Sequence, residues 1–154
     1  RRANSPDNDL ISTACDAINK IQNNTDELIM IAPPFPKEVY ELLKEDSGYD
    51  YYLESYKFLE KCSATKLYNY EDITKFSQDS NADCEFIDGL HGGDTINARM
   101  FIDLSKKNKN LNNFIDSEYL TTFIKTYKGF ASGMSHEIFS IPKEKDFLGL
   151  GCKK

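Results

Sequence analysis

The chain has 154 residues, of which 40% are hydrophobic and 29% charged, and its formal net charge is −6. This length suits one domain with a sizeable core, and the 10 Phe and 9 Tyr argue against an intrinsically disordered chain. The acidic balance argues against a general nucleic-acid binder, which needs a basic surface, and no stretch reaches the roughly 20 apolar residues of a membrane-spanning helix.

The first half of the chain alternates patterns that are typical of helices and strands. Apolar residues recur at helical spacing after Asp7 or Asp9, either of which could cap the helix. The apolar run LIMIA suits a strand covered on both faces, and the prolines after it must end that strand. The elements expected here are helices over 7–22, 37–44 and 50–62 and strands over 28–32 and 65–72.

The second half begins with a weakly patterned segment and then the run CEFID, residues 84–88, which predicts another short strand. The turn GLHGG follows, and Asp94 could cap a helix over 95–106. That helix would bury four apolar residues: Ile96, Met100, Phe101 and Leu104. A polar linker, a helix over 116–128 that ends at Gly129, and a weakly patterned tail complete the chain.

Strands that alternate with helices predict an α/β domain with a parallel sheet. We expect a single domain over 1–130, followed by the tail over 131–154. Because parallel sheets bind ligands at the carboxyl ends of their strands, the Pro33–Pro36 loop and the Asp88–His91 turn should share that edge.

The four cysteines, Cys15, Cys62, Cys84 and Cys152, do not have the spacing of a zinc site. Their even number favours two disulfides in an exported, extracytoplasmic protein, and the alternative is four buried thiols in a cytosolic one. Cys62 and Cys84 both precede strand-like runs, and neighbouring strands can start side by side. We therefore expect a Cys62–Cys84 disulfide.

Asp88 and His91 form an Asp-x-x-His pair among three glycines. A carboxylate that accepts a hydrogen bond from one imidazole nitrogen fixes the tautomer and stabilises the imidazolium when the other nitrogen takes a proton. Glycines permit the close approach and unusual dihedral angles that so tight a turn needs. The spacing therefore makes Asp88 and His91 candidate catalytic residues, although both are also ordinary turn residues.

The stretch FIDGLHGGDTINARMFIDL resembles the C-terminal signature of the SGNH/GDSL hydrolase superfamily, in which a strand leads into an Asp-x-x-His turn and then a helix. The matching residues are Phe86, Asp88, Gly89, His91, Asn97, Met100 and Phe101. The segments LIMIAPPFP and KLYNYED resemble upstream elements of the same fold, so that the resemblance covers roughly residues 26–106. The exported O-acetyltransferase and esterase members are the most similar.

The resemblance implies a three-layer α/β domain with a parallel sheet. It implies that His91 is the general base that activates a serine and that Asp88 orients it. The reaction would be acyl transfer, through an acyl-enzyme, to water or to a sugar hydroxyl. The substrate would be an acylated cell-surface glycan or a small ester.

The sequence departs from the family pattern in one respect. It lacks a Gly-Asp-Ser-type turn for the nucleophile and the glycine and asparagine of the oxyanion hole. The chain also opens on Arg1 rather than methionine. We therefore expect the C-terminal portion of an SGNH-like domain, incomplete at its N-terminal side, with the serine supplied by a companion segment or chain.

The competing interpretation is a non-catalytic α/β binding or interaction domain in which the Asp-x-x-His turn is structural only. A buried His91 capped by backbone groups would favour it. No cofactor is expected. A metal site is not expected either, because strand alternation would point Cys84 and Asp88 away from Asp83 and Glu85.

Three further features carry less weight. His136, beside Glu137, is best interpreted as an exposed residue of the tail. The tyrosines of residues 49–58 are more typical of core and rim packing than of a carbohydrate cleft. Gly92 and Gly93 could seat an anion at the start of the following helix, but Asp94 opposes it there.

Overall fold

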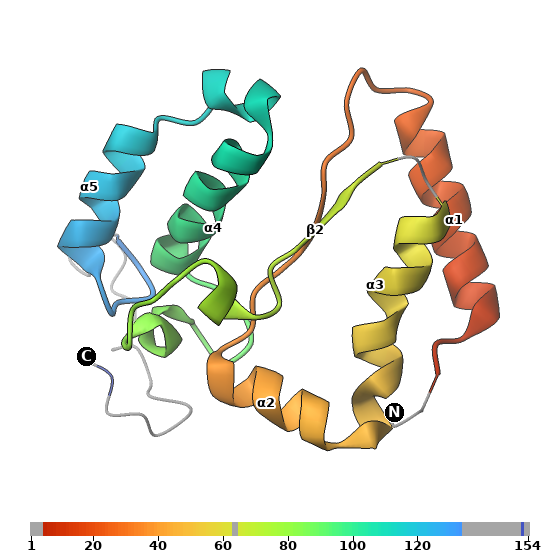
Figure 1. Ribbon diagram of the computed structural model, residues 1–154, viewed down its shortest axis with the longest axis horizontal. Coiled ribbons are helices and arrows are strands. Elements are labelled where there is room, and N and C mark those ends of the chain that lie inside the picture. The colour runs from red at the N-terminus through yellow and green to blue at the C-terminus, as the bar shows by residue number, and fades with distance from the viewer. Residues whose placement is uncertain (1–4, 63–64, 134–151, 153–154) are drawn as a thin grey trace. The chain divides into compact units, whose positions relative to one another are not determined.

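The computed structural model describes residues 5–62, 65–133 and 152. Its α-helices are α1 (Asn8–Gln22), α2 (Lys37–Glu45), α3 (Asp50–Cys62), α4 (Asp94–Lys107) and α5 (Ser117–Tyr127) (Figure 1). Its strands are β1 (Met30–Ala32) and β2 (Leu67–Asn69), and its 3-10 helices are η1 (Ser47–Tyr49), η2 (Ile73–Lys75), η3 (Ala82–Glu85) and η4 (Lys109–Asn113). The predicted α/β class with a parallel sheet is confirmed, and the sheet has two strands within the described residues.

The chain divides into two compact units, each described here by itself. The first unit comprises residues up to Ala32 and those from Tyr40 to Asn69, and the second comprises Pro33–Val39 and the chain from Tyr70 onward. The Asp88–His91 turn belongs to the second unit.

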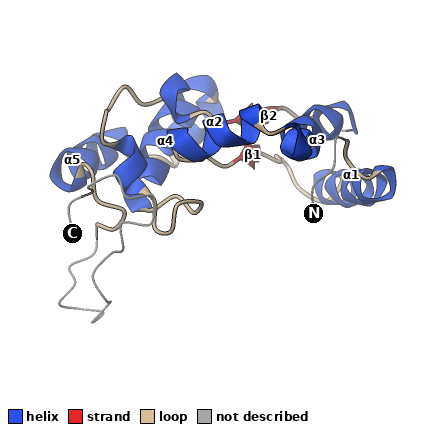
Figure 2. Ribbon diagram, turned by 90° about the horizontal axis from the view of Figure 1, so that it is seen from below, coloured by secondary structure: helices blue, strands red, loops and turns tan. Residues whose placement is uncertain are grey.

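In the first unit, α1 and α3 lie side by side (Figures 1 and 2). The carboxylate of Asp7 caps α1, because its Oδ1 accepts the backbone N–H groups of Asp9 and Leu10. A disulfide joins Cys15 to Cys62 across the two helices, with their Cα atoms 5.4 Å apart. The parallel strands are shorter than the predicted ones, and Met30 pairs with Leu67 at the start of the register.

In the second unit, a small apolar core forms around η2, η3 and the first turn of α4. Its buried members are Ile73, Ala82, Phe86 and Ile96, with Phe76 packed against them. Helix α4 runs along α5 (Figure 1). The proline-rich segment joins this unit through a hydrogen bond from the backbone N–H of Phe35 to the carbonyl of Glu71, at 3.1 Å.

Disulfides form as the even cysteine count predicts, but the expected Cys62–Cys84 pair is wrong. Cys84 pairs with Cys152 instead, with a Cα–Cα distance of 5.3 Å. The expectation assumed that residues 84–88 begin a strand beside the strand after Cys62. Cys84 lies in a 3-10 helix, and the packing of α1 against α3 brings Cys15 to Cys62.

The expected strand over 84–88 is also wrong, because its first residues belong to η3. The two consecutive residues Glu85 and Phe86 are both buried, whereas Ile87 is exposed, so that strand alternation does not hold. The turn therefore does not follow a strand, and the predicted strand edge shared with the Pro33–Pro36 loop does not form.

Two details of the helix after the turn differ from the expectation. Gly93, not Asp94, is the N-cap residue, and Asp94 is the first residue of α4. Ile96, Met100 and Leu104 are buried as predicted, but the side chain of Phe101 is 40% exposed. Nowhere along residues 5–62 and 65–133 is a helix long and apolar enough to cross a membrane.

Candidate active site: the Asp88–His91 turn

Residues 85–93 form a short closed loop at the start of α4. Phe86 and Gly92 make an isolated antiparallel bridge, and the backbone N–H of Gly93 donates to the carbonyl of Glu85 at 2.9 Å. Inside this closure, the backbone N–H of Ile87 donates to the carbonyl of His91 at 2.8 Å. These two hydrogen bonds, which together form the Phe86–Gly92 bridge, hold the two ends of the loop together, so that the residues between them are presented as a tight turn.

The carboxylate of Asp88 organises the turn from within. Its Oδ1 accepts the backbone N–H groups of Leu90 at 3.1 Å and His91 at 2.8 Å. Aspartate commonly makes such bonds to backbone groups two and three residues ahead. Gly89 lies between them with φ of +78°, a conformation that favours glycine. The shape of this turn is therefore determined locally, by the residues of the sequence Asp-Gly-x-His.

The second oxygen of Asp88 bonds to the side chain of His91, with 2.6 Å between Oδ2 and Nδ1. An ionised carboxylate only accepts hydrogen bonds, so Nδ1 carries the proton, and Nε2 of the neutral ring is left as a proton acceptor. The ring of His91 is 77% exposed, and among the described residues it bonds to Asp88. The geometry thus creates an oriented imidazole whose second nitrogen is open to solvent.

These hydrogen bonds change the acidity of Asp88. The backbone N–H of His91, then its ring, and then the backbone N–H of Leu90 stabilise the ionised form and lower the pKa of Asp88 to about 2. Asp88 therefore stays negatively charged throughout the pH range in which an imidazole exchanges its proton, which is the state that a partner of a general base needs.

The lowered pKa of Asp88 predicts a pH dependence of stability. The ordinary pKa of 3.8 exceeds the folded value of about 2, so the contribution is complete above about pH 4 and is lost as the pH falls through about 2. We expect about 1 kcal/mol or less, because the carboxylate is 38% exposed and screened by solvent. Asp88→Asn keeps an acceptor for the backbone N–H groups but does not titrate.

The measurement is the free energy of unfolding in urea for both proteins between about pH 5 and pH 2. The difference between wild type and Asp88→Asn should shrink across this window, while the contributions of all other carboxylates cancel. A difference that stays constant down to pH 2 would mean that the bonds to Asp88 do not favour its charged form.

The two glycines after His91 fit the turn against its surroundings. A Cβ atom on Gly92 would lie 2.8 Å from Cγ2 of Ile96, and one on Gly93 would collide with the carbonyl of Ala131. The backbone N–H of Asp94 bonds to that carbonyl at 2.7 Å, and its carboxylate accepts the backbone N–H of Gly133 at 3.2 Å. The N–H groups of Gly93 and Asp94 therefore bind carbonyl groups of the chain, not an anion.

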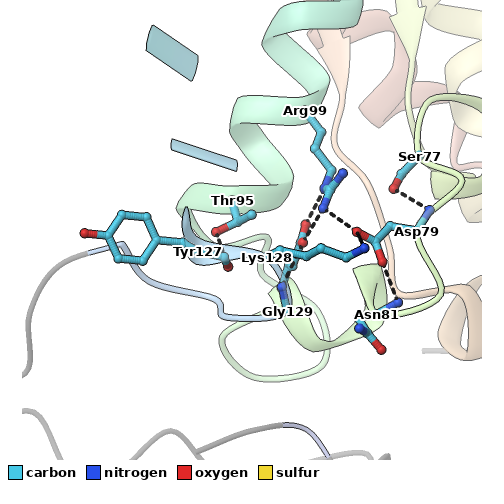
Figure 3. Close-up of polar contacts among 9 residues, drawn as sticks. Ser77, Asp79, Asn81, Thr95, Arg99, Tyr127, Lys128 and Gly129 are labelled. Carbon is cyan, nitrogen blue, oxygen red and sulfur yellow. Dashed lines mark hydrogen bonds and ion pairs between the residues drawn. The ribbon is translucent and has the colours of Figure 1, made fainter. Parts of the chain in front are cut away.

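Glu85, the first residue of the loop, belongs to a buried charge cluster that the sequence patterns did not reveal. Figure 3 labels Arg99, Asp79 and Lys128 of this cluster. Glu85 is fully buried, and its carboxylate accepts Nε and Nη2 of Arg99, both at 2.7 Å, and the backbone N–H of Gly129 at 3.2 Å. Nη2 of Arg99 also donates to Asp79 at 2.8 Å, and Lys128 lies 3.1 Å from the same oxygen. In the sequence, the one hint of this cluster is Arg99, which lies between the expected core residues Ile96 and Met100.

The pKa of Asp79 shows that the cations and N–H groups around it compensate for its burial. Burial raises the pKa of this carboxyl group, but the backbone N–H of Asn81, Lys128 and Arg99 outweigh it and keep the pKa below its ordinary value. The Asp79 carboxylate is therefore held in its charged form beside the guanidinium of Arg99.

The structure brings Asp88 and His91 together as predicted, whereas the weaker candidates have other roles or lie elsewhere. No group of three or more metal-ligating side chains gathers anywhere in the part of the chain described here. Cys84 is in a disulfide, and Asp83 accepts the backbone N–H of Lys37 at 2.6 Å. His136 lies outside the described residues.

Of the α3 tyrosines, Tyr52 and Tyr56 pair with each other, with 2.9 Å between their hydroxyl oxygens and an edge-to-face ring contact. That these tyrosines bind a carbohydrate stays a prediction.

Comparisons of this chain with protein-family models, curated proteins and solved structures found no match.

Proposed function

We propose that Asp88 and His91 are the carboxylate and the general base of an SGNH-like serine esterase or O-acyltransferase, with the nucleophilic serine supplied from outside this chain. The observation that carries the proposal is the 2.6 Å bond from His91 Nδ1 to Asp88 on a ring that is 77% exposed. This bond makes Nε2 the acceptor, and exposure leaves it open to a hydroxyl that another segment brings.

The reaction follows from this arrangement. Nε2 of His91 takes the proton of the serine hydroxyl while the serine oxygen attacks the ester carbonyl carbon. When the tetrahedral intermediate collapses, its ester C–O bond breaks and the leaving alcohol receives that proton from Nε2. Water or a sugar hydroxyl then attacks the acyl-serine, with His91 again moving one proton. Asp88 stays ionised and stabilises the imidazolium in both halves.

The rest of the proposed assembly follows the same reasoning. The companion segment or chain would add the serine, the oxyanion-hole donors and the further strands that complete a three-layer domain. The Cys15–Cys62 and Cys84–Cys152 disulfides support an oxidising, extracytoplasmic compartment. An ester-linked acyl group on a cell-surface glycan, or a small ester, is the proposed substrate.

The competing function is a non-catalytic α/β binding or interaction domain. In that case His91 would serve the turn, and a buried ring capped by backbone groups would be expected. The turn is instead closed by Asp88 and backbone bonds, which do not need the imidazole, while the imidazole itself faces solvent. This contrast is our reason for favouring the catalytic function.

The experiment is to label the native, as-isolated material with a fluorophosphonate probe, which reacts with activated serines, and to measure intact masses. We expect one adduct on a serine-bearing companion that co-purifies with this chain, and we expect it to disappear in His91→Ala. His136→Ala is the matched control, because it removes the other histidine of the chain.

The outcomes separate the functions. No adduct, or an adduct that persists in His91→Ala, would overturn the catalytic proposal and favour the binding domain. An adduct on this chain that disappears in His91→Ala would keep the role of His91 but overturn the external origin of the serine.

A further inference from the structure

We infer that Glu85 and Arg99 are positioning residues, whose buried ion pair fixes the base of the loop that presents Asp88 and His91. A catalytic role for this positioning rests on the proposed function. The orientation of the His91 ring, which the ion pair would control, can be measured without it. Glu85 has no exposed surface and Arg99 is only 14% exposed, so we assign them a positioning role rather than direct contact with a substrate. They act through the loop.

The first step is that Glu85 joins the loop to the rest of the unit at two places. Its carbonyl accepts the N–H of Gly93 and so closes the loop, while its carboxylate binds Arg99 and the N–H of Gly129. The same residue is thus part of the loop closure and part of the charge cluster. The ion pair therefore restrains the residue whose backbone adjoins the Phe86–Gly92 bridge.

The second step is that the other end of the loop is held as well. Asp94 bonds through its backbone N–H to Ala131 and through its carboxylate to Gly133. The bonds of Asp88 fix the internal shape of the turn, whereas the two anchors determine the direction in which it faces, since its tip is exposed at Ile87 and Leu90. The Glu85 anchor is the one with a buried charge.

The third step concerns geometry. A guanidinium that donates Nε and Nη2 to one carboxylate defines both the distance and the plane of the pair, which an apolar contact of the same volume does not. Buried ion pairs often stabilise less than apolar packing would, and fixing a unique arrangement is one reason to retain them. Here the ion pair would fix the position of the loop of residues 85–93, which carries His91.

The test uses the full chain with Glu85→Gln and records both ring nitrogens of His91 by long-range ¹H–¹⁵N correlation at about pH 8, where an ordinary imidazole is neutral. Wild type should show His91 mainly as the Nδ1-protonated tautomer. Glu85→Gln should loosen the closure that holds the backbone of Ile87 against the carbonyl of His91, so that the Asp88–His91 bond forms less often. The preference for the Nδ1-protonated tautomer should then fall, and the two nitrogen resonances should move toward each other. Asp79→Asn is the matched control, since it removes the other carboxylate bound by Arg99 and leaves the bonds of Glu85 in place.

A folded Glu85→Gln protein with the wild-type tautomer would overturn the inference and leave Glu85 as a contributor to stability only. If Glu85→Gln does not fold, Arg99→Lys decides the same question, because it keeps the positive charge and loses the two-point geometry. The tautomer measurement needs neither serine nor substrate. Absence of fluorophosphonate labelling would therefore count against the proposed function and not against this inference.

Discussion

Replacement of His91 by alanine is expected to reduce acyl transfer by about a thousandfold or more and to change the free energy of unfolding by less than about 0.5 kcal/mol. In the proposed function the activity falls because His91 is the group that takes the serine proton. The stability hardly changes because the ring is 77% exposed, and both backbone bonds of His91, to Asp88 and Ile87, remain possible with alanine.

This prediction is checked with the assembled protein, by hydrolysis of a chromogenic acetyl ester and by urea unfolding of the same samples. His136→Ala is the control for loss of a histidine as such and should behave like wild type in both assays. Activity that survives in His91→Ala would remove His91 from the reaction. A loss of several kcal/mol in stability would instead identify His91 as a residue of the fold.

The Arg99→Met substitution should lower the free energy of unfolding by about 3–5 kcal/mol. It removes the shared partner of Glu85 and Asp79, whose side chains are 0% and 7% exposed. Methionine fills much of the space but donates no hydrogen bond. Glu85 would then keep only the N–H of Gly129, so that a buried charge is left without compensation.

Lys107→Met provides the matched control on the same helix. Lys107 pairs with Asp103 at 2.5 Å, but the two side chains are 46% and 23% exposed, so its loss should cost less than about 1 kcal/mol. Urea unfolding followed by circular dichroism measures both variants. Equal losses for Arg99→Met and Lys107→Met would mean that water reaches the cluster and that its burial does not determine its energy.

The helices agree closely with the sequence because their signals are local. Asp7 caps α1, and α5 ends two residues before Gly129, which has φ of +78°, so that each boundary depends on neighbouring residues alone. The turn was predictable for the same reason, since Asp88, Gly89 and His91 define it within four residues. Periodicity, however, favoured a strand at 84–88, because it assumes that polar residues face outward.

The sequence by itself determined the helices, the mixed α/β class and the meeting of Asp88 with His91, because residues close together in the chain decide each of them. It also indicated disulfides, through the even number of cysteines. Only the tertiary structure decided which cysteines pair and that Glu85 is buried. A buried carboxylate is stable only beside partners such as Arg99 and Gly129, which lie 14 and 44 residues away. Contacts at that separation depend on how whole helices pack, so the position of Arg99 among apolar helix residues hints at a buried charge but does not identify its partners.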